Sequence, residues 1–219
     1  MIEKVRFTSG ALSLEGILNT PEGSVSFPAA IICHPHPLYG GSMDNNVVNS
    51  LFIALSRMSF VLLKFNFRGV GGSEGKFSHG AGEQEDTAAA ISFISSVKGI
   101  DLEKIAVAGY SAGAAFSLPV ASKDDRVKAL VAISPPLGMS GFEFLRNCVK
   151  PKLLISGSED SFTPSSLFLE FCQMLPEPKE YHVIKTADHF WWGHEGTITA
   201  KVIPFLNSAL QSQEKKKPS

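Results

Sequence analysis

The chain has 219 residues, of which 44% are hydrophobic and 19% are charged, and its formal net charge is −1. A chain of this length can bury a full hydrophobic core, and the balanced charge excludes a nucleic-acid-binding surface, which needs clustered lysines and arginines. The three cysteines are too few and too widely spaced for a disulfide framework.

The amino terminus carries charges where a secretory signal peptide would be apolar. No apolar run approaches the roughly 18 residues of a membrane span. We therefore expect a cytoplasmic protein in a reducing compartment, with neither a membrane nor a nucleic acid among its partners. A single domain is predicted over residues 1–211, followed by a polar tail over residues 212–219.

The predicted elements change character along the chain. Residues 5–8 and 12–18 alternate apolar and polar side chains around a turn, which is typical of an antiparallel hairpin at a sheet edge. From Pro28 onward, short apolar runs alternate with longer helical segments, which indicates a parallel sheet with crossover helices. Buried strands are expected at residues 29–34, 60–67, 105–109, 129–134, 152–157 and 181–184. Helices are expected at residues 45–58, 82–97, 112–122, 165–174 and 195–211.

A candidate nucleophile lies at residues 109–113, which read Gly-Tyr-Ser-Ala-Gly between an expected strand and an expected helix. This pattern is typical of a nucleophile elbow, in which a sharp turn raises the serine hydroxyl above the sheet. The glycines are needed because a Cβ at either flanking position would collide with neighbouring backbone. Ser111 is therefore the expected nucleophile. The N–H of Ala112, at the helix start, is expected to bind developing negative charge in an oxyanion hole.

Five motifs, in this order, resemble the α/β-hydrolase superfamily. They are His-Pro-His-Pro-Leu-Tyr-Gly-Gly at 34–41, Asn-Phe-Arg-Gly-Val-Gly-Gly-Ser-Glu-Gly at 66–75, the elbow at 109–113, Gly-Ser-Glu-Asp-Ser-Phe-Thr-Pro at 157–164 and Ala-Asp-His-Phe at 187–190. Within that superfamily the chain is similar to small lid-less bacterial serine hydrolases, close to dienelactone-hydrolase-like and prolyl-oligopeptidase-like esterases. The resemblance implies an α/β fold with a mostly parallel central sheet, an antiparallel N-terminal hairpin, helices on both faces and no cap domain.

A serine nucleophile needs a base, and His182, His189 and His194 follow Ser111 along the chain. His182 falls within an expected strand and His194 near a helix start. His189 lies in the loop after the last strand, from where it can fold back over the sheet edge. The resemblance also selects His189, through the motif Ala-Asp-His-Phe.

The base needs an acid partner, and both Glu159 and Asp160 follow the strand that ends at Gly157. The resemblance selects Asp160, because the family motif places an aspartate there with a proline four positions later. The competing interpretation is that Asp160 only caps the turn before Pro164, although one carboxylate has enough oxygens for both tasks. Asp188 is expected to stabilise its own loop.

The loop after the first parallel strand is expected to supply a second oxyanion N–H. Pro35 and Pro37 have no N–H, so His36, Leu38 and Tyr39 remain. Alignment with the family's loop selects the backbone of His36, with the other two as alternatives. No carboxylate or third histidine stands at a useful spacing from the histidines of this loop, so no metal site is expected. The implied hydrolysis needs no cofactor.

A substrate pocket is expected where aromatic residues surround the acid and the base. Its expected lining residues are Leu38, Tyr39, Tyr110, Phe162, Phe190 and Trp191. The segment 135–151 is long enough for a turn and a short helix but too short for a cap domain. An open cleft for small or short-chain substrates is therefore expected.

These features predict a serine hydrolase that cleaves small or short-chain carboxylic esters through an acyl-enzyme intermediate, with a small-molecule ester as its partner. A peptidase or thioesterase with the same three residues is an alternative, and so is a non-catalytic binding module on the same fold. The protein is expected to be a monomer or a homodimer, since the adjacent tryptophans 191 and 192 could also form a subunit contact.

Overall fold

The computed structural model describes residues 1–23, 26–139 and 141–211, so the polar tail predicted at 212–219 lies outside the described residues. The described strands are β1 (Ile2–Ser9), β2 (Leu12–Asn19), β3 (Phe27–Cys33), β4 (Val61–Phe65), β5 (Ile100–Tyr110), β6 (Val127–Ile133), β7 (Lys152–Gly157) and β8 (Lys179–Ile184). The described helices are α1 (Asn46–Ser56), α2 (Ala81–Ser96), α3 (Ala112–Lys123), α4 (Ser165–Gln173), α5 (Glu195–Gln211) and the short 3-10 helices η1 (Pro37–Tyr39) and η2 (Glu143–Asn147).

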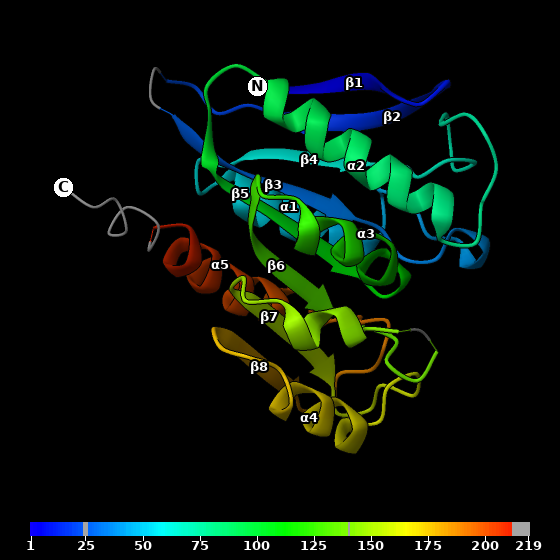
Figure 1. Cartoon of the computed structure of the whole chain (residues 1–219), viewed down its shortest axis with the longest axis vertical. Coiled ribbons are helices and arrows are strands. Elements are labelled where there is room, and N and C mark those ends of the chain that lie inside the picture. Colours follow the sequence, from blue (N-terminus) through cyan, green and yellow to red (C-terminus); the bar gives the residue numbers. More distant parts are fainter. Residues whose placement is uncertain (24–25, 140, 212–219) are drawn as a thin grey trace.

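All eight described strands belong to one sheet, in the order β1-β2-β4-β3-β5-β6-β7-β8 (Figure 1). β1 pairs with β2 and β2 pairs with β4 in antiparallel orientation, whereas the other neighbours are parallel. The predicted class, a mostly parallel α/β sheet with an antiparallel N-terminal hairpin at one edge, is therefore confirmed.

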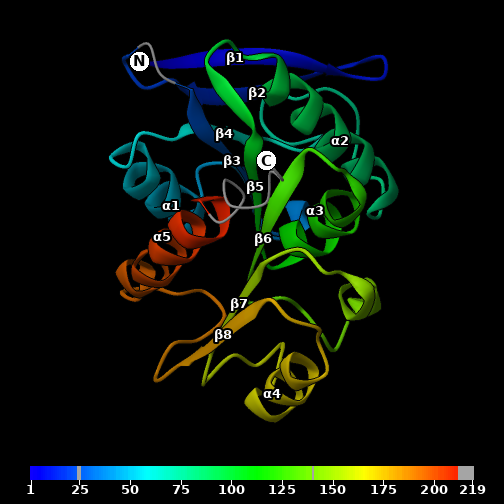
Figure 2. The same ribbon diagram turned by 60° about the vertical axis from the view of Figure 1, so that its left-hand side comes forward.

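Helices cover both faces of the sheet (Figure 2). α1 and α5 pack on one face, whereas α2, α3 and α4 pack on the other. The strands supply both cores alternately, so that Ile31 of β3 packs toward α2–α4 and Ile32 packs toward α1 and α5. This two-sided burial explains why the parallel strands are nearly continuous hydrophobic runs.

Several strands begin or end one or two residues from their predicted bounds, and β5 differs most. β5 begins at Ile100, five residues before the predicted start at Ile105, because Ile100 pairs with Phe27 at the beginning of β3. Residues 101–104 extend this strand with partly or fully exposed side chains, including Leu102 at 48% exposure. They resemble a loop in sequence because this end of the strand lies beyond the hydrophobic core.

The parallel arrangement brings the loops after β3, β5, β6, β7 and β8 to one edge of the sheet. Between β6 and β7 the described residues contain turns and the five-residue η2, as the prediction of a short helix without a cap domain required. Within the described ranges, no helix has the length and apolar character needed to cross a lipid bilayer.

Candidate active site

Ser111 occupies a sharp turn between β5 and α3. Its backbone has φ 53° and ψ −124°, which an L residue adopts only under strain. Its N–H donates to the Ile133 carbonyl at the end of β6 (2.8 Å), and its carbonyl accepts the Ala114 N–H (2.9 Å). Hydrogen bonds on both sides of the residue therefore hold the strained turn in place.

The two glycines of the elbow are required by close backbone contacts. A Cβ at Gly109 would lie 2.5 Å from the backbone nitrogen of Ala114, and a Cβ at Gly113 would lie 2.5 Å from the carbonyl oxygen of Cys33. These separations are far below van der Waals contact. The sequence pattern thus lets α3 start directly against β3 and β5, which leaves the serine at the sheet edge.

Three side chains from separate loops meet at this edge. The Ser111 hydroxyl lies 2.8 Å from Nε2 of His189, and Nδ1 of His189 lies 2.9 and 3.0 Å from the two carboxylate oxygens of Asp160. The loops that carry them follow β5, β8 and β7. All three residues are buried, with exposed fractions of 9%, 6% and 4% for the serine, the histidine and the aspartate. The structure brings together the three residues that the sequence selected.

The alternative residues lie elsewhere. Glu159 has an exposed side chain. His182 remains within β8, where burial lowers its pKa, and His194 precedes α5. Neither histidine has a hydrogen bond to Ser111 among the described contacts.

The ionisation of Asp160 decides which nitrogen of the His189 ring carries a proton. Burial raises the pKa of the Asp160 carboxyl, but the hydrogen bond with His189 and the N–H of Phe162 outweigh burial and keep this pKa below its ordinary value. An ionised carboxylate only accepts hydrogen bonds, so Nδ1 of His189 carries the ring proton. Nε2 is then free to accept the hydroxyl proton of Ser111.

The loop that carries His189 is fixed from two sides. The Tyr110 hydroxyl donates to the His189 carbonyl oxygen at 2.6 Å. Asp188 Oδ1 accepts the N–H groups of Phe190 and Trp191 at 2.9 and 3.0 Å, so the prediction that Asp188 stabilises its own loop is confirmed. The imidazole therefore sits on a backbone that is hydrogen-bonded before and after it.

Two backbone N–H groups remain available beside Ser111. Ala112 is the first residue of α3, so its N–H has no acceptor within the helix. The N–H of Leu38 donates to Nδ1 of His36 (3.2 Å), and the N–H of Tyr39 donates to the His36 carbonyl (3.1 Å). The N–H of His36 itself has no acceptor among the described residues. Of the three candidate donors in this loop, His36 is therefore the one that is free.

His34 controls the direction of that N–H. Its Nε2 accepts the N–H of Phe67 at 3.1 Å, so Nδ1 carries the proton and donates to the Pro35 carbonyl at 2.7 Å. Burial lowers the pKa of His34 to about 4, which keeps the ring neutral. The Pro35 carbonyl and the His36 N–H belong to one trans peptide and point in opposite directions. Holding the carbonyl against His34 therefore orients the N–H.

A cavity of about 660 Å³ opens beside Ser111. Four of the six residues predicted to line a pocket do line it, namely Tyr39, Tyr110, Phe162 and Phe190. None of the described residues around the cavity is a lysine, an arginine, an aspartate or a glutamate. The cavity is therefore apolar apart from hydroxyl, imidazole, amide and backbone groups.

The structure corrects two expected pocket residues. Leu38 is 67% exposed and does not line the cavity, because the turn of η1 leaves its side chain in solvent. Trp191 is fully buried in the core between the sheet and α5, and its Nε1 donates to Ser134 Oγ at 2.9 Å. Its positive φ of 63° turns the chain away from the cavity.

Among the lining residues that sequence analysis missed, three have aromatic side chains: Phe77, His79 and Phe116. Phe116 follows Ala112 by four residues and so lies on the same face of α3, a spacing that could have identified it. Phe77 and His79 come from the segment between β4 and α2, which has no local pattern that points to the site.

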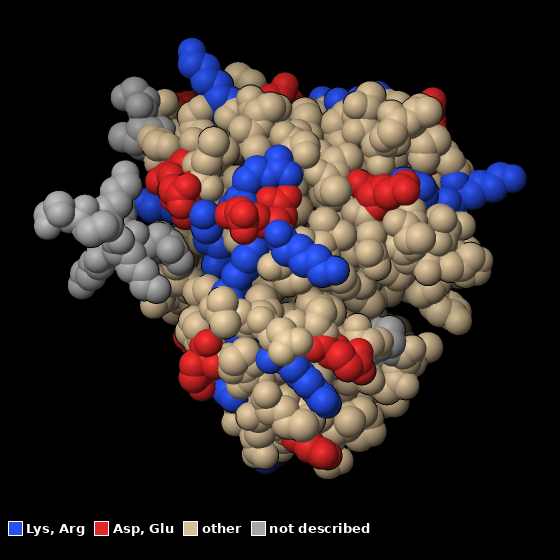
Figure 3. Space-filling view, in the orientation of Figure 1, with Lys and Arg blue, Asp and Glu red and all other residues tan. Residues whose placement is uncertain are grey.

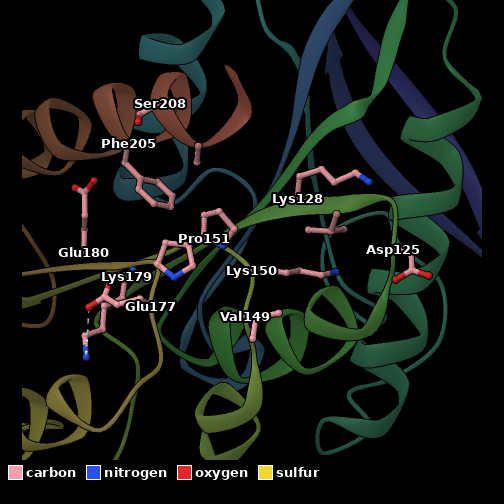
Figure 4. Close-up of a pocket in the computed structure, with 13 residues that line it drawn as sticks. Asp125, Lys128, Val149, Lys150, Pro151, Glu177, Lys179, Glu180, Phe205 and Ser208 are labelled. Atoms are coloured by element: carbon pink, nitrogen blue, oxygen red, sulfur yellow. Dashed lines mark hydrogen bonds and ion pairs between the residues drawn. The ribbon is translucent and has the colours of Figure 1, made fainter. Parts of the chain in front are cut away.

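A second cavity, of about 530 Å³, lies at the opposite edge of the sheet, at the amino-terminal ends of β6–β8 (Figure 4). Its lysines are already paired. Lys150 donates to the carbonyls of Ala121 and Asp124 at 3.0 and 2.5 Å, and Lys128 pairs with Glu103 at 2.8 Å. Figure 3 shows charges of both signs gathered over this side of the molecule. Among the described residues that line this cavity, none is a histidine or a cysteine.

No group of three or more His, Cys, Asp and Glu side chains among the described residues is arranged to hold a metal ion. The side chains gathered at the Ser111 edge are a hydroxyl, an imidazole and a carboxylate.

Comparisons place the chain among known proteins. The model of the alpha/beta hydrolase fold family matches residues 31–147. An alpha-beta serine hydrolase homologue from Coxiella burnetii is 33% identical, with a TM-score of 0.83 and coverage of 92% of this chain and 96% of that chain. A protein of unknown function from Agrobacterium tumefaciens is 31% identical, with a TM-score of 0.88 and coverage of 99% and 100%. A serine hydrolase without a lid from Xanthomonas campestris is 27% identical, with a TM-score of 0.82 and coverage of 99% and 97%. An uncharacterized protein of Rickettsia prowazekii is 31% identical over 79% of this chain and 80% of its own length.

Proposed function

This chain belongs to the α/β-hydrolase fold family, and we propose that it is a serine hydrolase that cleaves small or short-chain carboxylic esters. The observation that carries the proposal is the hydrogen-bonded series from the Ser111 hydroxyl through His189 to Asp160. A nucleophile, a base and a group that orients the base, in this relation, are what acyl transfer to water requires.

In the proposed acylation step, Ser111 Oγ attacks the ester carbonyl carbon while Nε2 of His189 takes the hydroxyl proton. The new C–O bond pushes an electron pair onto the carbonyl oxygen, which the N–H groups of Ala112 and His36 stabilise. Each such donor lowers the barrier by about 3 kcal/mol. Asp160 stays ionised and stabilises the imidazolium. His189 then donates its proton to the leaving alcohol as the ester C–O bond breaks.

Deacylation repeats these steps with water as the nucleophile. Nε2 of His189 takes a proton from the water as its oxygen attacks the acyl carbon, and the same two N–H groups bind the oxyanion. The proton then returns to Ser111 Oγ when the acyl-enzyme bond breaks. The carboxylic acid leaves, and the hydroxyl, imidazole and carboxylate are restored.

Two features favour a small neutral ester over a peptide. The described part of the segment between β6 and β7 contains only turns and η2, so a short approach to Ser111 remains open. The described residues that line the cavity include no lysine, arginine, aspartate or glutamate that could clamp a peptide terminus. Both features support an ester hydrolase more than a peptidase that acts on chain ends.

The test is covalent labelling combined with turnover. A fluorophosphonate probe is expected to label Ser111, and p-nitrophenyl acetate and butyrate are expected to be hydrolysed. Ser111→Ala should lose labelling and lower kcat by about 10⁶-fold, the loss seen when a nucleophile is removed, with unchanged thermal unfolding. An unlabelled wild-type protein would favour the binding module. Faster turnover of acyl thioesters or aminoacyl amides than of esters would replace the proposed substrate class.

A further inference from the structure

The cavity beside Ser111 has a wall made of aromatic rings. The His36 ring lies 4.8 Å from Phe77, 4.9 Å from Tyr39 and 6.1 Å from Phe116, measured between ring centroids. Phe77 and Phe116 are also 6.1 Å apart. We call these four residues the ring wall. All four line the cavity, although they come from η1 and its N-cap residue, from the segment before α2 and from α3.

The position of the ring wall relative to the oxyanion donors indicates which half of an ester it contacts. His36 carries both a ring of the wall and the proposed oxyanion N–H, and Phe116 lies one helical turn after Ala112. When the ester carbonyl oxygen is bound between these two N–H groups, the acyl half of the ester therefore lies beside the ring wall.

The leaving alcohol belongs on the other side, because His189 must protonate it. The His189 ring is flanked by Phe162 at 4.3 Å and by Phe190 at 5.8 Å, and both line the cavity. Phe162 and Phe190 are therefore assigned to the alcohol half. The direction that remains for the acyl group is toward the ring wall.

Charge further limits the acyl group. No described lysine, arginine, aspartate or glutamate lines the cavity, so an ionic group there would lose hydration without gaining a counter-charge. Burial lowers the pKa of His36; Glu83 opposes this shift and His79 adds to it. The wall therefore presents neutral rings near neutral pH.

Building on the proposed ester hydrolysis, we propose that the acyl half of the substrate carries an uncharged aromatic ring, as in esters of small aryl or arylalkanoic acids. Offset and edge-to-face contacts with the ring wall supply an attraction that an alkyl group of equal size lacks. A rigid ring also loses less conformational freedom on binding than a linear chain that fills the same space. The cavity volume of about 660 Å³ leaves room for such a ring beside the ester group.

The test holds the leaving group constant and varies the acyl group. p-Nitrophenyl phenylacetate and p-nitrophenyl cyclohexylacetate have nearly equal size, but only the first has an aromatic acyl ring. We expect kcat/KM to be about three- to tenfold higher for phenylacetate, the range that aromatic contacts support. A second pair compares the p-nitrophenyl ester of succinic acid, which carries a free carboxylate, with the neutral p-nitrophenyl 4-oxopentanoate. The value of kcat/KM should be at least tenfold lower for the anionic ester.

Variants of the ring wall connect this preference to the assigned residues. Phe77→Leu should bring the phenylacetate to cyclohexylacetate ratio close to one. Tyr39→Leu, at a residue that is 83% exposed, provides a second wall variant that does not disturb the core and should lower the same ratio. Phe144→Leu is the matched control, because Phe144 lies on η2 and does not line the cavity. It should leave the ratio unchanged.

The outcomes separate this inference from the proposed function. Turnover of p-nitrophenyl acetate without any preference for phenylacetate over cyclohexylacetate would overturn the aromatic acyl assignment and leave the esterase intact. Turnover of the anionic succinic acid ester equal to that of the 4-oxopentanoate would overturn the requirement for an uncharged acyl group. A preference that survives both wall variants would place the ring elsewhere. Absence of turnover of every ester, together with an unlabelled Ser111, would instead refute the proposed function.

Discussion

Replacement of Asp160 by asparagine tests the proposed role of His189 through its tautomer. Asp160 Oδ1 accepts the N–H groups of Phe162 and Thr163 at 3.0 and 3.2 Å. An asparagine would keep its carbonyl oxygen at that position, because only an acceptor satisfies two N–H donors. Its amide NH₂ would then replace Oδ2, which lies 2.9 Å from Nδ1 of His189.

A donor at that position reverses the imidazole. The carbonyl oxygen at the Oδ1 position also lies 3.0 Å from Nδ1, but its two lone pairs accept the N–H groups of residues 162 and 163. Nδ1 of His189 would therefore have to accept from the amide, so the ring proton would move to Nε2, which could no longer take the proton of Ser111. An equivalent substitution in a hydrolase of this type lowers kcat about 10⁴-fold, a loss of about 5.5 kcal/mol of transition-state stabilisation. We expect Asp160→Asn to lower kcat for p-nitrophenyl acetate by this factor, with a much smaller effect on KM.

The assay compares steady-state kinetics of Asp160→Asn with those of Asp188→Asn. Asp188 is also a carboxylate next to His189, but its Oδ1 accepts the backbone N–H groups of residues 190 and 191, which an asparagine oxygen can also do. The control should therefore stay within a few-fold of the wild type. An Asp160→Asn enzyme that kept kcat within tenfold of the wild type would refute the tautomer argument.

The remaining predictions concern stability. The pKa of buried His34 is about 4 in the fold, against about 6.5 when unfolded, so only the unfolded chain takes up this proton as the pH falls between these values. Roughly 3 kcal/mol of unfolding free energy should therefore be lost between pH 7.5 and pH 4. Urea titrations at the two pH values should show this loss in the wild type, and His34→Gln should lack the contribution of this histidine. Gly113→Ala should lower the unfolding free energy by about 1–3 kcal/mol, because its Cβ would overlap the carbonyls of β3. Gly196→Ala, in the open first turn of α5, should be neutral or raise it by about 0.5–1 kcal/mol, and equal effects of the two changes in thermal melts would contradict the packing argument.

The features that sequence predicted well depend on local patterns. The elbow was predictable because glycine is the only residue that permits the backbone contacts at positions 109 and 113. The parallel strands were predictable because burial on both faces makes each one a short apolar run between helical segments. The order of the motifs along the chain then identified the loops that carry the acid and the histidine.

The choice of the second oxyanion donor could not be made from the residues alone. Proline excluded two positions in the loop, but three N–H groups remained equivalent in sequence. The structure distinguishes them because η1 folds its chain back onto His36, which accepts the N–H groups of Leu38 and Tyr39. The imidazole of His34, which holds the Pro35 carbonyl, depends on Phe67 from the segment after β4. Such a contact has no signal within the loop itself.

The error at Trp191 has the same physical origin as the strain at Ser111. Both residues have positive φ angles without being glycine, 63° and 53°, and Ser134, which accepts the Trp191 indole N–H, has a φ of 43°. Each such residue costs about 1–3 kcal/mol and persists only where its surroundings hold it. Here the bonds of Ser111 to β6, of Trp191 to Asp188 and of its indole to Ser134 do so. The residue type does not show that a position has a strained backbone, so sequence analysis placed both Phe190 and Trp191 in the pocket. In the structure the turn directs the Phe190 ring to the cavity and the Trp191 ring to the core.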